Sequence, residues 1–160
     1  MGAAKVVAVG RDQRTLEKLR QLDSRRVVAA PLTGGLADDA QKIDKAGSGA
    51  NLVVDASAAH APEPTLACIN SLGAQGVAVF VGGVRADIPL PYMNILRKQL
   101  TIRGSYMYPR FVPGELLRMI APGVLDLSAV KIHAFPLEDI NEALEQAPNF
   151  KGLEFCVIVT

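Results

Sequence analysis

The sequence has no tryptophan, only two cysteines and almost no excess of charge of either sign. Its 17 basic residues nearly match its 16 acidic residues, so charge gives no reason to expect nucleic acid or an anionic membrane as a partner. No apolar run approaches the roughly 20 residues that a membrane-spanning helix needs. We therefore expect neither nucleic-acid binding nor membrane insertion.

The cysteines and histidines are too few and too scattered to form a metal site. Cys68 and Cys156 lie far apart in apolar segments, which favours buried thiols over a disulfide or a reactive thiol. This usage indicates a reducing compartment, and we expect the cytoplasm. Neither cysteine stands at metal-ligand spacing from His60 or His133, so we expect no metal in this chain. P-loop, G-x-S-x-G and paired-carboxylate motifs are also missing.

Strand and helix patterns do alternate along the whole sequence. Apolar, strand-like segments lie at residues 5–9, 26–30, 51–55, 76–81, 100–104, 131–135 and 155–159. Helices are expected at residues 12–22, 36–46, 61–72, 113–120 and 137–146. This alternation predicts one α/β domain over residues 1–160, with a doubly wound parallel sheet and helices on both faces. Residues 84–92 contain two prolines and allow at most an edge strand.

Small residues follow three successive strands of the predicted sheet. Ala56 and Ser57 follow the third strand, Gly82 and Gly83 follow the fourth, and Gly104 ends the fifth. Ligands of open parallel sheets bind beyond the carboxyl ends of the strands. Each set alone is compatible with ordinary turns, but together they predict a groove in which a planar ligand lies against the backbone.

The corner after the first strand carries a signal for cofactor specificity. Sheets that bind NAD usually place an acidic residue here, where it accepts a hydrogen bond from the ribose 2′-hydroxyl. This sequence has Gly10 at the corner, followed by Arg11, whose planar guanidinium suits a 2′-phosphate. The pair favours NADP over NAD. The alternative is a simple helix entry with a solvated arginine.

Two further groups of polar residues have simpler expected roles. His60 follows a strand and is a candidate proton carrier, whereas His133 lies on an alternating strand and is expected to point to solvent. Asp38 and Asp39 are expected to form the solvated first turn of a helix, where acidic residues are favourable.

The sequence resembles the cofactor-binding half of the medium-chain dehydrogenase/reductase superfamily, which includes zinc-type alcohol dehydrogenases and quinone oxidoreductases. The resemblance extends from about residue 3 to residue 160. The segments that carry it are GAAKVVAVGR at 2–11, NLVVD at 51–55, VGG at 81–83, LTIRGSY at 100–106 and FPLEDINEA at 135–143.

The resemblance implies a Rossmann-like fold that binds NAD(P). It implies ribose or 2′-phosphate contacts at Gly10, Arg11 and Arg14. It implies backbone contacts with the rest of the dinucleotide near Ala56, Ser57, Val81, Gly82, Gly83 and Gly104. It also implies a homodimer with a contact near residues 88–93, and hydride transfer between NADP(H) and a small alcohol, aldehyde, ketone or enone.

The sequence also departs from the family pattern. It contains no counterpart of the family's catalytic domain, and we expect it to lack the usual first strand and its Gly-rich turn. Near the end, Glu154 stands where an acid would disfavour a pyrophosphate, although Lys151 is close by. We therefore expect the cofactor-binding portion of an oxidoreductase that is not catalytic alone. The alternative is a non-catalytic nucleotide-binding or dimerisation module.

The missing first strand leaves a physical problem in the sheet. In the strand order 3-2-1-4-5-6 that strand is central, so the segments at 5–9 and 51–55 would each face an empty slot of unpaired backbone groups. Such groups are costly to bury and adhesive when exposed. Either the two strands pair directly, or another chain fills the gap, or the early strand pair docks elsewhere.

Overall fold

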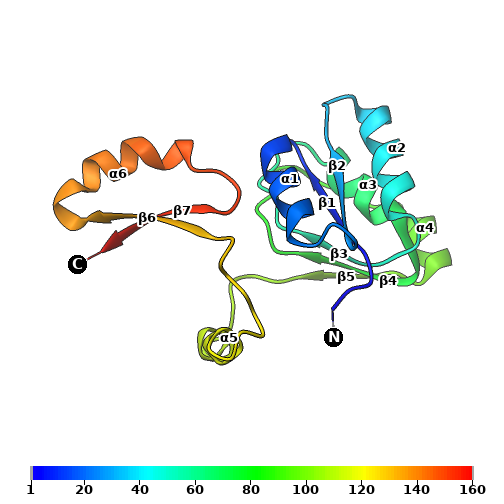
Figure 1. The fold of residues 1–160 in the computed structure, drawn as a ribbon. Coiled ribbons are helices and arrows are strands. Elements are labelled where there is room, and N and C mark those ends of the chain that lie inside the picture. Colours follow the sequence, from blue (N-terminus) through cyan, green and yellow to red (C-terminus); the bar gives the residue numbers. More distant parts are fainter. Residues whose placement is uncertain (1, 160) are drawn as a thin grey trace.

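The computed structural model describes residues 2–159, and its strands and helices alternate along the chain (Figure 1). The strands are β1 (Val6–Gly10), β2 (Val27–Pro31), β3 (Ala50–Asp55), β4 (Leu72–Phe80), β5 (Thr101–Gly104), β6 (Lys131–Pro136) and β7 (Glu154–Val159). The helices are α1 (Gln13–Leu22), α2 (Leu36–Gly47), α3 (Glu63–Ser71), α4 (Tyr92–Lys98), α5 (Val112–Ile120) and α6 (Ile140–Gln146). Two 3₁₀ turns, η1 (Leu137–Asp139) and η2 (Ala147–Asn149), flank α6.

Every described strand pair is parallel, which confirms the predicted α/β class. The strands form three hydrogen-bonded sheets rather than one, in the orders β1-β2, β3-β4-β5 and β6-β7. In the first sheet Val6 lies opposite Val27, and in the second Val53 lies opposite Ala78. β1 and β3 are not hydrogen-bonded to each other, so direct pairing, the first way of closing the predicted gap, does not occur.

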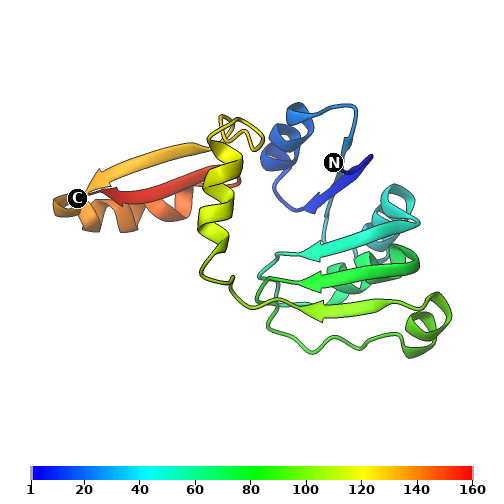
Figure 2. The same cartoon turned by 90° about the horizontal axis from the view of Figure 1, so that it is seen from below.

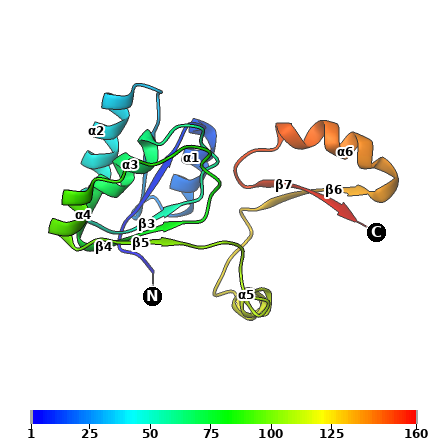
Figure 3. The same cartoon turned by 180° about the vertical axis from the view of Figure 1, so that it is seen from behind.

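The best-packed core lies under the second sheet. Ile69 of α3 and Leu72 and Ala78 of β4 are fully buried, because α3 packs its apolar side on this sheet. Leu100 and Ile102 pack against the same cluster. Seen from behind, α2, α3 and α4 lie on one side of β3-β4-β5 (Figure 3).

Helix α4 was not predicted, because the sequence pattern assigned no element to residues 93–99. It begins directly after Pro91, at a position where proline is tolerated. The Lys98 Nζ holds its last turn by donating to the carbonyl oxygens of Asn70, at 2.9 Å, and Leu72, at 2.6 Å. This anchor is tertiary, so local sequence patterns did not reveal it. Strand β4 also begins four residues earlier than the expected residue 76, at Leu72.

The last two strands and α6 form a separate layer that α5 connects to the rest (Figures 1 and 2). This C-terminal unit, residues 131–159, touches α1 through an ion pair between the Lys18 Nζ and the Glu154 Oε1 at 2.8 Å. No helix within residues 2–159 combines the length and the apolar character needed to cross a bilayer.

Candidate functional site

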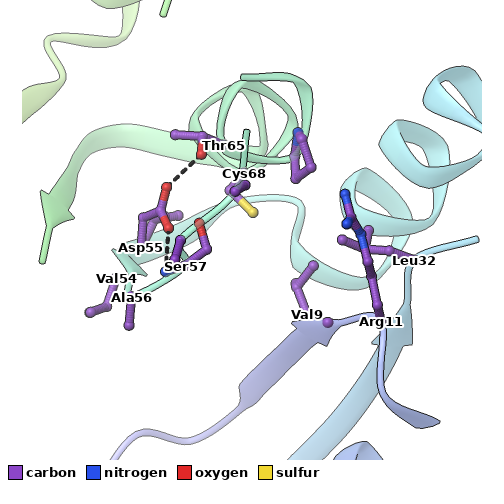
Figure 4. A pocket seen from close by; sticks show the side chains of 14 residues that line it. Val9, Arg11, Leu32, Val54, Asp55, Ala56, Ser57, Thr65 and Cys68 are labelled. Carbon is purple, nitrogen blue, oxygen red and sulfur yellow. Dashed lines mark hydrogen bonds between the residues drawn. The ribbon is translucent and has the colours of Figure 1, made fainter. Parts of the chain in front are cut away.

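A groove of about 520 Å³ lies between the carboxyl ends of β1 and β3 (Figure 4). It includes the residues after the third strand at which the sequence predicted a ligand groove, but not Gly83 or Gly104, and it is open at the surface between the first two sheets. Its lining residues are Val9, Gly10, Arg11, Leu32, Val53, Val54, Asp55, Ala56, Ser57, Ala58, Ala59, Pro64, Thr65 and Cys68.

The β1 side of the groove is set by the entry into α1. The Asp12 carboxylate caps this helix, accepting from the Arg14 backbone N–H at 3.0 Å and from the Thr15 hydroxyl at 2.7 Å. The Thr15 hydrogen bond is the main reason that the pKa of Asp12 lies below its ordinary value. With the corner fixed, the Arg11 side chain extends beside Leu32 at the groove wall (Figure 4). Arg14 is exposed on α1 and is not among the lining residues.

The β3 side is organised by Asp55, a residue to which the sequence analysis gave no role. Its carboxylate accepts from the Ser57 backbone N–H at 2.9 Å and from the Thr65 hydroxyl of α3. Burial opposes the charge, but the hydrogen bonds from Ser57 and Thr65 outweigh it and lower the pKa of Asp55. An aspartate side chain often accepts a hydrogen bond from the backbone N–H two residues later, which forms a turn, so this contact has a local sequence signal. The contact with Thr65, ten residues later, has no such signal.

Asp55 also joins the groove to the next strand. Its carbonyl oxygen accepts from the Val81 backbone N–H at 2.9 Å and from the Gly82 N–H at 2.8 Å. A Cβ atom on Gly82 would lie 1.9 Å from the Ser57 carbonyl oxygen, so only glycine fits there without a shift. Gly82 lines a smaller pocket of about 200 Å³ that also includes Asp55, Phe80, Val84 and Ile88.

The predicted site residues therefore divide into two groups. Gly10, Arg11, Ala56 and Ser57 line the groove, and Gly82 adjoins it. Val81, Gly83, Gly104 and Arg14 line neither of the two pockets. A Cβ on Gly83 or Gly104 would meet nothing within 4 Å, so no close approach requires glycine at these positions.

The thiol that lines the groove, Cys68, is not an activated nucleophile. Cys68 and Cys156 are both free, and burial, followed by the charge of Asp55, raises the pKa of Cys68 to about 11. Its thiol is therefore protonated near neutral pH and unreactive. His60 is exposed and lines neither pocket. Residues 2–159 contain no group of three or more His, Cys, Asp or Glu that could hold a metal.

His133, Glu154 and Asp39 correct three sequence expectations. His133 does not point freely to solvent, because its ring stacks on Phe150 at 3.9 Å and lies 3.1 Å from the Glu154 Oε2. Glu154 turns to Lys18 and His133 rather than to the groove, and these two hydrogen bonds, led by Lys18, lower its pKa to about 2. Asp39 is buried rather than solvated, because it accepts hydrogen bonds from Thr33 and Gly34.

Curated relatives of this chain include a D-xylulose reductase and an L-arabinitol 4-dehydrogenase. A D-xylulose reductase A of Aspergillus niger is 27% identical over 157 residues, which is 96% of this chain and 43% of the relative. An L-arabinitol 4-dehydrogenase of Hypocrea jecorina is 37% identical over 78 residues, covering 48% of this chain and 20% of the relative. The chain thus spans less than half the length of the curated relatives it matches.

Solved structures share the fold at low sequence identity. An L-idonate 5-dehydrogenase of Escherichia coli matches with a TM-score of 0.75 and 22% identity over 99% of this chain and 44% of the other. An E. coli alcohol dehydrogenase complexed with NADH matches with a TM-score of 0.76 and 16% identity over 98% and 44%. These matches confirm the Rossmann-like arrangement.

The family profile decides the relationship. The profile of the zinc-binding dehydrogenases matches residues 1–121, which is most of the chain and includes both sides of the groove. The chain therefore belongs to the zinc-binding dehydrogenase family, the zinc-type alcohol dehydrogenases of the medium-chain dehydrogenase/reductase superfamily.

Proposed function

We propose that this chain is the cofactor-binding portion of an oxidoreductase that uses NADP(H). The observation that carries the proposal is the pair Gly10 and Arg11 on the wall of the groove. Gly10 brings no carboxylate that would repel a phosphate, and Arg11 has no side-chain hydrogen bond or ion pair within residues 2–159. A free guanidinium at a strand end is a suitable partner for the 2′-phosphate.

The other walls of the groove suit the rest of a dinucleotide. Ala56 and Ser57 bring short side chains to the strand end, and Gly82 lets two backbone segments approach closely. Asp55 holds both segments, so the groove keeps its shape before a ligand arrives. When bound, the nicotinamide supplies the hydride chemistry, and these residues bind and orient the cofactor.

The substrate class follows from the relatives. The curated relatives named above are reductases or dehydrogenases of sugars and polyols, so we propose a small alcohol or its carbonyl counterpart as substrate. The described residues bring no metal cluster and no activated nucleophile to the groove. We therefore propose that residues 1–160 bind cofactor without turnover. A purely structural dimerisation module is the alternative.

Fluorescence titration with NADPH and NADH tests this proposal. The 160-residue chain should bind NADPH at micromolar concentration and more tightly than NADH. Arg11→Ala should weaken NADPH binding about 10- to 100-fold, the effect of losing a charged hydrogen-bonding partner, and leave NADH binding unchanged. Arg25→Ala, which removes an exposed arginine outside the groove, is the matched control. No NADPH binding up to millimolar concentration would overturn the proposal.

Two further parts of the proposal concern assembly and location. We propose a homodimer with a contact at residues 88–93, where Tyr92 and Met93 are exposed at the start of α4. Sedimentation should give a dimer mass, and aspartate at both positions should give a monomer. We also propose a cytoplasmic location, which imaging of a tagged chain in its host would test.

A further inference from the structure

The groove is lined by two charged residues, which lie on opposite sides of it. Arg11 follows β1, and Asp55 is the last residue of β3 (Figure 4). The other lining residues carry no charge near neutral pH, because the one further titratable group among them, the Cys68 thiol, is protonated. A ligand that fills the groove therefore meets a cation on one side and an anion on the other.

The Asp55 carboxylate has acceptor capacity that the protein does not use. Its Oδ1 accepts from the Ser57 backbone N–H at 2.9 Å, and its Oδ2 accepts from the Thr65 hydroxyl. An ionised carboxylate can accept about four hydrogen bonds. Within residues 2–159 no lysine, arginine or histidine forms an ion pair with it. The side chain is half-buried and lines the groove, so lone pairs remain for a ligand.

This carboxylate stays charged near neutral pH. Burial opposes ionisation, but the hydrogen bonds from Ser57 and Thr65 outweigh it, so the pKa of Asp55 lies below its ordinary value. An ionised carboxylate only accepts hydrogen bonds. It attracts N–H and O–H donors and repels phosphate and carbonyl oxygens, which are acceptors themselves. The phosphate groups of a ligand are thus directed toward Arg11 and away from Asp55.

The part of the groove between the two charges suits the flat face of a base. Val9 and Cys68 lie between the charged side chains in Figure 4, and Ala56 and Pro64 add to the apolar lining. Small-molecule sites combine such apolar walls with a few polar groups that fix orientation. In NADP(H) the adenine is attached to the ribose that carries the 2′-phosphate, and its amino group, a hydrogen-bond donor, lies on the edge remote from that ribose. With the 2′-phosphate at Arg11, this edge is directed across the groove to the β3 side.

We propose that Asp55 recognises the adenine of the bound dinucleotide by accepting a hydrogen bond from its exocyclic amino group. The assignment rests on the proposed binding of NADP(H) in this groove, and it gives the carboxylate a role besides holding the segment after β3. Recognition of this kind distinguishes adenine from hypoxanthine, which carries a carbonyl oxygen in place of the amino group. The carboxylate then faces a second acceptor, and affinity is lost because neither group is satisfied.

Fluorescence titration with NADPH and with its hypoxanthine analogue, deamino-NADPH, tests this role in the wild-type 160-residue chain. Both ligands carry the same phosphates and the same reduced nicotinamide, so they differ only at the base. NADPH should bind at least tenfold more tightly, the effect of a hydrogen bond to a charged group. Arg11→Ala should weaken the binding of both ligands and preserve their ratio. Equal affinity of the wild type for the two ligands would overturn the proposal.

Two variants separate recognition by Asp55 from its structural contacts. Asp55→Asn keeps an oxygen that can accept from Ser57 and places an N–H donor where a carboxylate oxygen stood, so the preference for NADPH should be lost or reversed. Thr65→Val removes the hydroxyl that holds Asp55 but keeps the charge, so the preference should remain even if both affinities fall. A wild-type preference that persists in Asp55→Asn contradicts the proposal.

The outcomes also separate this assignment from the proposed function. NADPH binding that depends on Arg11, without discrimination against deamino-NADPH, supports the proposed function and overturns the role of Asp55 alone. If neither ligand binds the wild type at millimolar concentration, both fall.

Discussion

Gly82 is the residue at which the shape of the groove is most sensitive to a single methyl group. Its Cβ position lies 1.9 Å from the Ser57 carbonyl oxygen and 2.6 Å from the Ser57 nitrogen, both backbone atoms. Gly82→Ala must therefore move the segment after β3. We expect a loss of about 1–3 kcal/mol in the free energy of unfolding, the range found for overpacked sites, and weaker NADPH binding. Urea denaturation and fluorescence titration measure the two effects.

Gly83 provides the matched control for this prediction. A Cβ there would meet nothing within 4 Å, and its φ is not in the left-handed region. Gly83→Ala should change the unfolding free energy by less than about 0.5 kcal/mol. Equal effects of the two alanines would show that the contact between Gly82 and Ser57 does not shape the groove.

The sequence predicted part of the groove lining, and it missed Asp55, which holds the segments of the groove together. Gly10, Arg11, Ala56 and Ser57 line one groove because they lie at or just after the carboxyl ends of β1 and β3, two strands that the sequence predicted. The role of Asp55 depends on Thr65 in the next helix and on backbone donors of β4. Such a role follows from packing, and no local pattern encodes it.

Among the elements, α1 and β7 are joined by a contact that depends on pH. Lys18, and then His133, hydrogen-bond the Glu154 carboxylate and lower its pKa from an ordinary 4.5 to about 2. A lowered pKa in the folded state means that the contact stabilises the fold fully above pH 4.5 and loses its effect as the pH falls toward 2. Glu154→Gln should therefore lower the Tm near neutral pH and match the wild type near pH 2.

Thermal unfolding between pH 2 and pH 7 measures this difference. Lys18→Met removes the first of the two partners of Glu154. It should therefore lower the Tm at neutral pH by part of the amount that Glu154→Gln does, and its Tm should approach that of the wild type at low pH. Wild-type and Glu154→Gln curves that stay parallel down to pH 2 would contradict the prediction. Lys18 is half exposed, so salt screens this ion pair more than it would screen a buried one. Added salt should therefore reduce the difference in Tm between the wild type and Glu154→Gln.

The elements that local sequence did not reveal share one physical cause. Helix α4 is held by Lys98, which donates to carbonyl oxygens in the last turn of α3 and at the first residue of β4. His133 is held by Phe150 from the segment after α6. Alternation on β6 correctly predicted a strand, but it could not show that a ring from outside the strand covers the histidine. Local pattern thus predicts the type of an element better than its partners.

For the whole molecule, the division into three sheets is the feature that strand order alone left open. Three arrangements could close the gap beside β1, and the structure excludes one of them, direct pairing with β3. It also separates β6 and β7 from the first five strands. Periodicity along the sequence predicts each strand. Which strands pair by hydrogen bonds depends on which strands the tertiary fold places side by side.

This division predicts that the C-terminal unit opens before the rest of the molecule. Its strands contain no fully buried residue, and Ala143 of α6 is its one buried apolar residue among those described. The β4 core instead buries Ile69, Leu72 and Ala78 completely. Since local stability follows buried apolar contact, amides of β6 and β7 should exchange with a lower free energy of opening than those of β4. Native-state hydrogen exchange at rising urea concentration measures both values.

The ion pair between Lys18 and Glu154 allows a second test of this prediction. Glu154→Gln removes the ion pair that ties the C-terminal unit to α1, so exchange in β6 and β7 should become a few-fold faster while exchange in β4 stays unchanged. If β4 and β7 amides instead share one opening free energy and one urea dependence, the chain unfolds as a single cooperative unit. In that case the three sheets would open together, and the amides of β6 and β7 would be as well protected from exchange as those of β4.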